Sequence, residues 1–368
     1  MVPYEPKNLP LNSINWARHV SLIAKANAAL GYYNGILQGI VNPGVLLSPM
    51  STHEAVLSSR IEGTQASMEE VLKFEANPRE HLPATQHADI QEIINYRHAI
   101  GQAVQDLKTR PLCLNIIKKL HVILLNSVRG KNKSAGNFRR IQNFIGPLGS
   151  DINNAIFVPP SADRVEAAMD NWEKYLHFEE KDRLVQMAIV KAQFELIHPF
   201  LDGNGRIGRM IIPLFLFEKK ILSSPMFYLS EYLEEHRDIY YGALLRLSTE
   251  NDWDGWITFF LSAIIKQAES NSQKTKRILE LYEFMKKQVP RTIRSQYVVQ
   301  AIDTLFAHPI FSSTDFITHS EIPKDSAIRI LNALKKGEHI LDLKHGSGRR
   351  ASVMIFPKLM AITENTIM

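Results

Sequence analysis

The sequence predicts a mainly α-helical protein that ends in a small domain of mixed helices and strands. Residues 66–127 show no strand-like alternation for more than a few positions, and prolines divide them into segments of helix length. Two stretches, 153–160 and 340–356, have strand patterns instead. Because the chain has 368 residues, of which 45% are hydrophobic, we expect two or three domains with apolar cores.

The composition argues against a secreted, disulfide-bonded protein and against a membrane protein. Cys113 is the single cysteine, so no internal disulfide forms, and no stretch is apolar enough for a signal peptide or a membrane span. We therefore expect a cytoplasmic protein that does not enter membranes. The net charge of +5 is uneven, because residues 274–368 carry 15 Lys and Arg against 9 Asp and Glu. The remainder of the chain is close to neutral, which suggests that the two parts meet different partners.

Three parts are expected along the chain. The first begins with a helix around residues 16–30 and a loop over 43–49 that is rich in Gly and Pro. The last boundary follows from the polar run 269–274, which precedes a new helical pattern. The parts are an N-terminal helical segment over 1–105, a helical core over 106–270 and a C-terminal domain over 271–368.

The helix expected over residues 52–62 has an unusual last residue. Ser51 or Thr52 could cap its start, and Gly63 suits a left-handed stop at its end. Glu62 places a carboxylate where the helix dipole disfavours it by roughly 0.3–1 kcal/mol. Either Glu62 is a solvated surface side chain or a guanidinium elsewhere offsets this cost.

Three stretches of the core have distinct local patterns. Residues 129–140 form a basic loop, for which charge alone favours simple solvation over a phosphate or target contact. Residues 153–160 are β-prone and end in prolines, which predicts a small hairpin or an edge open to strand addition by a peptide. Residues 182–197 are apolar on every side, which predicts a buried helix that Pro199 ends near His198.

The densest group of candidate catalytic and binding residues lies at 198–209. This stretch reads His-Pro-Phe-Leu-Asp-Gly-Asn-Gly-Arg-Ile-Gly-Arg. Such charge is poor material for a core, because each buried charge needs a partner. A glycine turn at the start of a helix presents backbone N–H groups to an anion, and Arg206 and Arg209 lie on one face to reach further oxygens. Asp202 is placed to hold Mg²⁺ against phosphates. The stretch predicts a phosphate-binding site.

Two other interpretations of this stretch are weaker. Residues 203–208 also match the dinucleotide-binding pattern G-x-G-x-x-G, but that pattern needs a preceding strand, and here a buried helix precedes it. His198 and Asp202 could bind a transition metal, but two ligands do not complete a site.

The twelve residues resemble the signature H-P-F-x-D/E-G-N-G-R-x-x-R of Fic-domain proteins at every fixed position. Residues 58–63 resemble the S/T-x-x-x-E-G/N inhibitory helix of that family, and residues 136–139 resemble its G-x-F-R element. Residues 156–160 occupy the place of the flap that docks the target. The resemblance covers about residues 1–270 and implies a Fic-type helical core with a small β-hairpin flap.

The resemblance implies a protein adenylyltransferase that transfers AMP from ATP to a Ser, Thr or Tyr hydroxyl of a target protein or of itself. His198 would be the general base, Asp202 would bind Mg²⁺, and Arg206 would neutralise developing charge. A base with a pKa near 6.5 and a positively charged phosphate site suit such chemistry. The implied phosphate ligands are Gly203, Asn204, Gly205, Arg206 and Arg209.

The same resemblance implies inhibition. Ser58 and Glu62 would be the inhibitory residues, with Glu62 reaching Arg209 and blocking the productive position of the γ-phosphate. The implied docking residues of the flap are Ile156, Phe157 and Val158. Tyr240 and Tyr241 match an aromatic pair that lies beside the adenine in some relatives, although tyrosines that simply pack would look the same.

The C-terminal domain resembles a winged helix-turn-helix. A helix is expected over residues 323–337, followed by a hairpin of 340–344 and 352–356 with a basic tip. Its positive charge suits an acidic partner such as DNA, but such domains also bind proteins or form dimers, so a homodimer stays open. The apolar face of the helix would consist of Ala327, Ile330, Leu331 and Leu334.

Two other functions stay open at this point. The chain could be a DNA-binding regulator whose Fic module senses a nucleotide, or it could remove AMP from a modified protein, with Glu62 aligning a water molecule. The intact His198 and Asp202 favour the transferase over the sensor.

Overall fold

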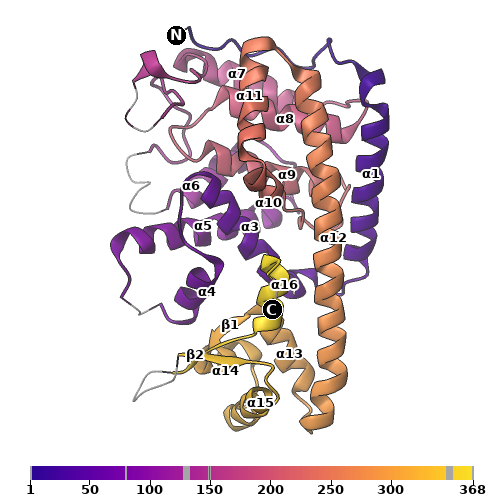
Figure 1. The fold of residues 1–368 in the computed structure, drawn as a ribbon. Coiled ribbons are helices and arrows are strands. Elements are labelled where there is room, and N and C mark those ends of the chain that lie inside the picture. The colour runs from indigo at the N-terminus through magenta and orange to yellow at the C-terminus, as the bar shows by residue number, and fades with distance from the viewer. Residues whose placement is uncertain are drawn as a thin grey trace.

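The computed structural model describes residues 2–78, 81–126, 133–147, 149, 151–344 and 351–366. Within these residues the protein is mainly helical, as predicted, with a three-stranded sheet near the C-terminus (Figure 1). In the same residues no helix combines the length and the apolar composition needed to cross a bilayer.

Helices form the larger part of the molecule, and the strands lie in its C-terminal part. The N-terminal and central elements are α1 (Trp16–Gln38), α2 (Pro43–Leu46), α3 (Ser48–Ile61), α4 (Met68–Ala76), α5 (Ala84–Asp106), α6 (Leu114–Leu124), η1 (Ile152–Asn154), η2 (Ala162–Arg164), α7 (Val165–Leu176), α8 (Arg183–Ile197), α9 (Asn204–Glu218), α10 (Ser230–Glu235), α11 (Arg237–Glu250) and α12 (Trp253–Thr292). The C-terminal elements are α13 (Val298–Ala307), β1 (Ile310–Ser312), α14 (Ser313–Ser320), α15 (Lys324–Lys336), β2 (Leu341–Lys344), β3 (Val353–Ile355) and α16 (Pro357–Glu364).

Helix α8 is the buried central helix that the sequence predicted. The Asp182 side chain caps it by accepting the N–H groups of Leu184 and Val185, each at 2.9 Å. From Leu184 to Ile197 every residue is buried, and α7, α9 and α12 pack around the helix. A rigid element therefore holds the residues that follow it.

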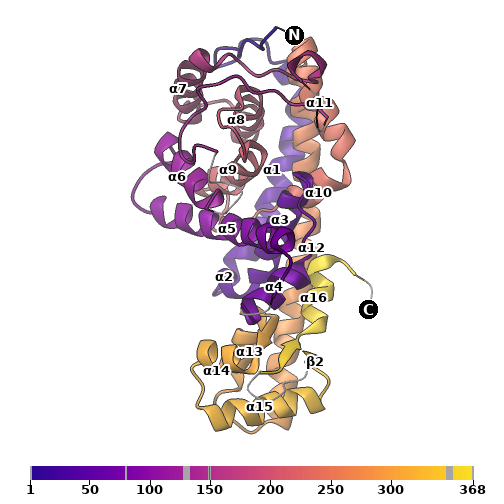
Figure 2. The same cartoon turned by 90° about the vertical axis from the view of Figure 1, so that its left-hand side faces the viewer.

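Helix α12 runs beside α1 and continues into the C-terminal part of the molecule (Figures 1 and 2). The prediction that the polar run 269–274 interrupts the helix was wrong, because these residues lie inside α12. Part of the run finds partners inside the fold: Lys274 pairs with Glu231 at 2.6 Å, and Asn271 accepts a hydrogen bond from Gln267 at 3.0 Å. The two parts are joined by a continuous helix, and the exact division into domains stays a prediction.

Helix α3 begins earlier than predicted. The expected loop over residues 43–49 forms α2 and the first turn of α3, so the helix starts at Ser48 and neither Ser51 nor Thr52 caps it. Prolines are tolerated in a first turn, because the N–H that they lack has no intrahelical partner there. The end is as predicted, since Glu62 follows the last turn and the glycine after it has a φ of 99°.

The C-terminal domain contains the predicted helix and hairpin. Helix α15 buries Ala327, Ile330, Leu331 and Leu334, as expected. The antiparallel sheet has the order β1-β3-β2, and helix α16 then turns back to pack on α3 and α12 (Figure 1). The predicted basic tip lies outside the described residues, and the assignment as a winged helix stays a prediction.

In the described residues of the predicted flap, Ile145 and Phe157 form an isolated bridge rather than a ladder. The Ile145 N–H donates to the carbonyl of Phe157 at 2.8 Å, and the carbonyl of Ile145 accepts from Ile156 and Phe157 at 2.8 and 3.1 Å. Pairing cannot continue past these residues, because Pro159 and Pro160 have no N–H to donate. The hairpin is correct in position but shorter than expected.

Candidate active site

The predicted site lies where α8 ends and α9 begins. His198 has a left-handed φ of 49°, while its N–H still donates to the carbonyl of Phe194 at 3.0 Å. Gly203, with a φ of 77°, precedes α9. The Asn204 side chain closes the loop between them, accepting the Phe200 N–H at 2.9 Å and donating to the Phe200 carbonyl at 2.8 Å. The loop is thus fixed by its own residues.

Arg139 stabilises this loop through hydrogen bonds to backbone carbonyls, including those of the flap. It is 2% exposed and donates to the carbonyl of His198 at 2.9 Å, as well as to the carbonyls of Ile141, Pro160 and Ile197. The solvation expected for residues 129–140 is therefore wrong at this position. A buried guanidinium needs hydrogen-bond acceptors, and these four backbone carbonyls supply them.

His121 of α6 also supports this loop, and nothing in its local sequence indicates this role. The Gly136 N–H donates to its Nδ1 at 2.8 Å, so Nε2 carries the proton and donates to the Asp202 carbonyl at 3.0 Å. Burial lowers the pKa of His121 to about 4, which keeps the ring neutral at pH 7. The ring also stacks on Phe200, with centroids 3.8 Å apart.

A cleft of about 690 Å³ opens beside the loop. This volume is typical of sites for small molecules and cofactors. Residues from α3, the flap, α8, α9 and α11 line it, among them Glu62, Ile156, Phe157, His198, Gly205, Arg209, Tyr240 and Tyr241.

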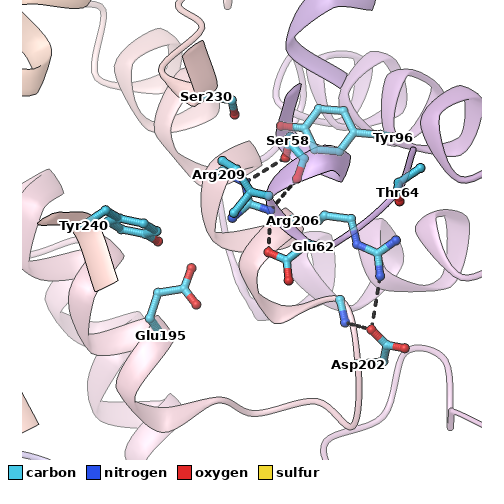
Figure 3. Close-up of polar contacts among 12 residues, drawn as sticks. Ser58, Glu62, Thr64, Tyr96, Glu195, Asp202, Arg206, Arg209, Ser230 and Tyr240 are labelled. Atoms are coloured by element: carbon cyan, nitrogen blue, oxygen red, sulfur yellow. Dashed lines mark hydrogen bonds and ion pairs between the residues drawn. The ribbon is translucent and has the colours of Figure 1, made fainter. Parts of the chain in front are cut away.

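The two arginines of the motif are held differently (Figure 3). Arg206 donates to Glu92 at 2.8 Å and to Asp202 at 3.1 Å. Arg209 is 2% exposed and donates to the Ser58 hydroxyl of α3 at 2.8 Å, to the Ser58 carbonyl at 2.8 Å and to the carboxylate of Glu62, just after α3, at 2.6 Å. The structure therefore places Glu62 on Arg209, as the resemblance implied, and adds Ser58 as a second partner of this arginine.

Charges in the cleft shift the pKa values of its residues. Burial would raise the pKa of Glu62, but the Arg209 guanidinium holds it below its ordinary value. Burial lowers the pKa of His198, and the carboxylates of Glu195 and Glu62 oppose this only in part. The imidazole of His198 is therefore neutral at pH 7 and can accept a proton.

Asp202 is the single motif carboxylate that could hold a metal. Its side chain is 40% exposed, and it pairs with Arg206 at 3.1 Å and with Lys133 at 3.9 Å. Mg²⁺ is often bound by one or two carboxylates together with substrate phosphates, so this donor fits. No cluster of three or more His, Cys, Asp or Glu suited to a metal occurs among the described residues. The other ligands would have to come from substrate and water.

The tyrosines and the flap residues fall into different environments. Tyr240 is 1% exposed, and its hydroxyl accepts from Lys191 at 3.0 Å, whereas Tyr241 is 42% exposed on the cleft. In the flap, Ile156 is 54% exposed, but Val158 is buried. Ile156 is therefore accessible at the surface of the cleft, and Val158 is a packing residue.

A buried ion pair beneath the cleft was missed by the sequence analysis. Lys191 and Glu195 of α8 pair with each other, Lys191 being fully buried. Gly208 makes room for them, because a Cβ there would overlap the Glu195 carboxylate. Lys191 and Glu195 lie in a helix whose other residues are mostly apolar, so the apolar pattern did not indicate a buried ion pair.

These features combine, in one helical module, a neutral histidine at the end of a buried helix and a glycine turn beside two arginines. Family models match the chain in two places: Fic/DOC family N-terminal over residues 20–105 and Fic/DOC family over residues 111–216. The chain belongs to the Fic/DOC family.

Named relatives and solved structures agree with this assignment. A probable protein adenylyltransferase of Aquifex aeolicus is 25% identical over 202 residues, which cover 54% of this chain and 58% of the relative. The protein adenylyltransferase Fic of Drosophila grimshawi is 22% identical over 229 residues, covering 59% of this chain and 41% of the relative. The chain thus matches about half the length of these relatives.

The fold has counterparts along nearly the whole chain. A Fic family protein from Desulfovibrio desulfuricans has a TM-score of 0.59 and 20% identity, with 96% of this chain and 98% of that chain covered. Fic-1 from C. elegans has a TM-score of 0.55 and 19% identity, with 72% of each chain covered. At these identities the likeness concerns the fold.

Proposed function

We propose that the protein is an adenylyltransferase that moves AMP from ATP to a Ser, Thr or Tyr hydroxyl of a target protein, and that α3 inhibits it. The proposal is carried by one observation: His198, Gly205 and Arg209 line one cleft, and Arg209 is already bonded to Glu62. The curated relatives are named protein adenylyltransferases, which supports the same chemistry.

In this proposal His198 is the base for the transfer of AMP from ATP. The target hydroxyl oxygen attacks the α-phosphorus of ATP, and its bond forms as the bond to the bridging oxygen of the β-phosphate breaks. Pyrophosphate leaves, and the hydroxyl proton passes to His198, whose lowered pKa keeps it neutral beforehand. Arg206 and the N–H groups at the start of α9 stabilise the negative charge.

Mg²⁺, when bound, would neutralise charge on the phosphates, with Asp202 as its protein ligand. Asp202 now pairs with Arg206, so the same carboxylate also orients this arginine. Glu92 holds the other side of the guanidinium at 2.8 Å. Arg206 is therefore fixed in direction before any ligand enters.

Inhibition in this proposal results from competition for Arg209. The guanidinium would bind the γ-phosphate, but its Nε and Nη2 already donate to Ser58 and Glu62. An incoming phosphate would also meet the negative charge of Glu62 at close range, which is unfavourable. The γ-phosphate can therefore reach its place only after Glu62 moves.

Transfer is tested with ATP labelled at the α-phosphate. We expect Glu62→Gly to label itself or a lysate protein faster than the parent, and Glu62→Gly with His198→Ala to lose this labelling. Labelling retained without His198 would overturn the mechanism. A target already carrying labelled AMP, incubated with the parent, tests the reverse direction: release of AMP that depends on Glu62 would favour deAMPylation.

We also propose that the C-terminal domain contacts an acidic partner, with duplex DNA as the first candidate. Lys324, Arg329 and Lys336 are exposed on α15. Binding of the full chain to a DNA duplex should weaken as salt increases, because such contacts release counterions. No binding at low salt would count against DNA.

A further inference from the structure

Helix α3 is anchored at a second place, two turns before Glu62. Glu54 is 4% exposed and accepts three hydrogen bonds: from the Ser230 N–H at 3.0 Å, from the Ser230 hydroxyl at 2.6 Å and from the Tyr96 hydroxyl at 3.2 Å. Tyr96 belongs to α5, and Ser230 begins α10. One carboxylate thus ties α3 to two other helices.

The neighbouring residue extends this anchor to the C-terminal domain. Glu231 accepts hydrogen bonds from Lys274 at 2.6 Å, from Gln267 at 3.0 Å and from Asn365 at 3.1 Å. Lys274 and Gln267 lie on α12, and Asn365 follows the last turn of α16. Hydrogen bonds therefore connect the end of α16, through residues 230 and 231, to α3.

The spacing along α3 makes the two ends of the helix act together. Glu54, Ser58 and Glu62 are each four residues apart, so they lie on one face of the helix, about 6 Å per step. Ser58 and Glu62 bind Arg209, and Figure 3 shows Ser230 and Tyr96 near the Ser58 end of this contact. A displacement at Glu54 would shift both contacts with Arg209.

The end of α3 has a further restraint that is independent of Arg209. Arg237 of α11 donates to the carbonyl of Ile61 at 2.8 Å. Helix α16 packs directly on α3, so the C-terminal domain reaches this helix by packing as well as by hydrogen bonds.

We infer that Glu54 is a positioning residue for the inhibitory helix, and that Glu231 links it to α16, so that the placement of the C-terminal domain sets how firmly Glu62 holds Arg209. The inference rests on the proposed function, because it concerns how the proposed inhibition is maintained. It assigns the C-terminal domain a regulatory role whichever partner it binds.

Two substitutions of Glu54 test the inference in the full chain. Glu54→Ala removes all three bonds. Glu54→Gln keeps them, because the amide oxygen can accept the Ser230 N–H while the amide nitrogen donates to the two hydroxyls. We expect autolabelling by Glu54→Ala to rise about tenfold or more over the parent, as for the loss of charged hydrogen bonds. Glu54→Gln should stay at or below the level of the parent.

A rise in activity is informative, because a variant that is merely unstable would lose activity. Glu62→Gly is the positive control. If it labels and Glu54→Ala stays silent, Glu54 does not position the helix. If Glu54→Ala fails to fold, Tyr96→Phe and Ser230→Ala, which each remove part of the anchor, take its place with the same expectation.

Hydrogen exchange tests the inference without relying on transfer. Amides of α3 should exchange faster in Glu54→Ala than in Glu54→Gln. If Glu62→Gly itself shows no labelling, the proposed function fails, and equal exchange in the two Glu54 variants would then overturn the inference as well.

A substitution of Asn365 tests the link to the C-terminal domain. Asn365→Asp places a carboxylate against Glu231 and should raise both α3 exchange and labelling, the latter about two- to fivefold for a surface contact between like charges. Asn365→Ala, which removes the bond without repulsion, should have a smaller effect. Unchanged α3 exchange in Asn365→Asp would refute the link.

Discussion

Glu54 should make the protein less stable as the pH rises through 7. Burial raises the pKa of Glu54 from 4.5 to about 7, and the hydrogen bonds from Ser230 and the charge of Arg209 oppose this only in part. The folded protein therefore binds more protons than the unfolded chain between these two pH values. The stability that protonated Glu54 contributes is complete below pH 4.5 and is lost as the pH rises through about 7.

The size of this effect follows from the two pKa values. One pKa unit corresponds to about 1.4 kcal/mol, so a rise from 4.5 to about 7 corresponds to about 3 kcal/mol. Glu54 is 4% exposed, so solvent screens little of this energy. Glu54→Gln removes the titration and can keep the hydrogen bonds. We therefore expect it to match the parent near pH 4.5 and to exceed its stability by about 3 kcal/mol above pH 8.

Urea unfolding at pH 5 and pH 8, followed by tryptophan fluorescence, measures this difference. Trp172 and Trp256 are buried in the helical part and report on its unfolding. Other titrating groups are common to parent and variant, so their contributions cancel. Glu69→Gln is a suitable control, because the Glu69 side chain is 45% exposed on α4. The reasoning is refuted if Glu54→Gln differs from the parent by the same amount at both pH values.

Three further substitutions test the supports of the site by urea unfolding. Arg139→Met should lower the free energy of unfolding by about 2–5 kcal/mol, because buried carbonyls, among them that of His198, lose their donor; a loss below about 1 kcal/mol would contradict the bracing role. Gly208→Ala should cost about 1–3 kcal/mol through overlap with Glu195, and a neutral result would mean that Glu195 lies elsewhere. Lys191→Met should cost about 3–5 kcal/mol by leaving Glu195 unpaired, and adding Glu195→Gln should recover much of this loss.

Local sequence patterns predicted the helices around residues 16–30, 52–62, 182–197 and 323–337, because apolar periodicity and prolines act within a few residues. Helix α8 and its end at His198 follow from a continuous apolar run and from Pro199. The polar run 269–274 misled because its side chains find partners on α10, which the sequence around them does not reveal. Tertiary contacts can keep a polar segment helical.

The same distinction applies to the candidate site: its local motif could be predicted from the sequence, but its long-range contacts could not. Residues 198–209 carry a dense signature, whereas Glu62 reaches Arg209 across 147 positions, and the family resemblance alone connected them. His121 and Arg139 act on backbone carbonyls, so nothing in their local sequence identifies their partners. A single sequence contains no local pattern from which contacts between distant elements can be predicted.

Gly205 offers a direct measure of the contact between Glu62 and Arg209. A Cβ at this position would overlap Glu62 Oε1 and lie 3.1 Å from Arg209 Nη1. Glu62 can swing away from the added methyl group, so Gly205→Ala costs the parent at most the energy of the contact that Glu62 gives up. For a hydrogen bond between charged groups this is about 1.5–3 kcal/mol.

In the Glu62→Gly background the same substitution meets no carboxylate. Alanine is also a better helix former than glycine by about 1 kcal/mol, so Gly205→Ala should there be neutral or stabilising. A double-mutant cycle measured by urea unfolding should therefore give an interaction energy of at least about 1 kcal/mol between positions 205 and 62. Equal costs of Gly205→Ala in both backgrounds would mean that Glu62 does not rest against the start of α9 in solution, and the proposed inhibition would lose its structural basis.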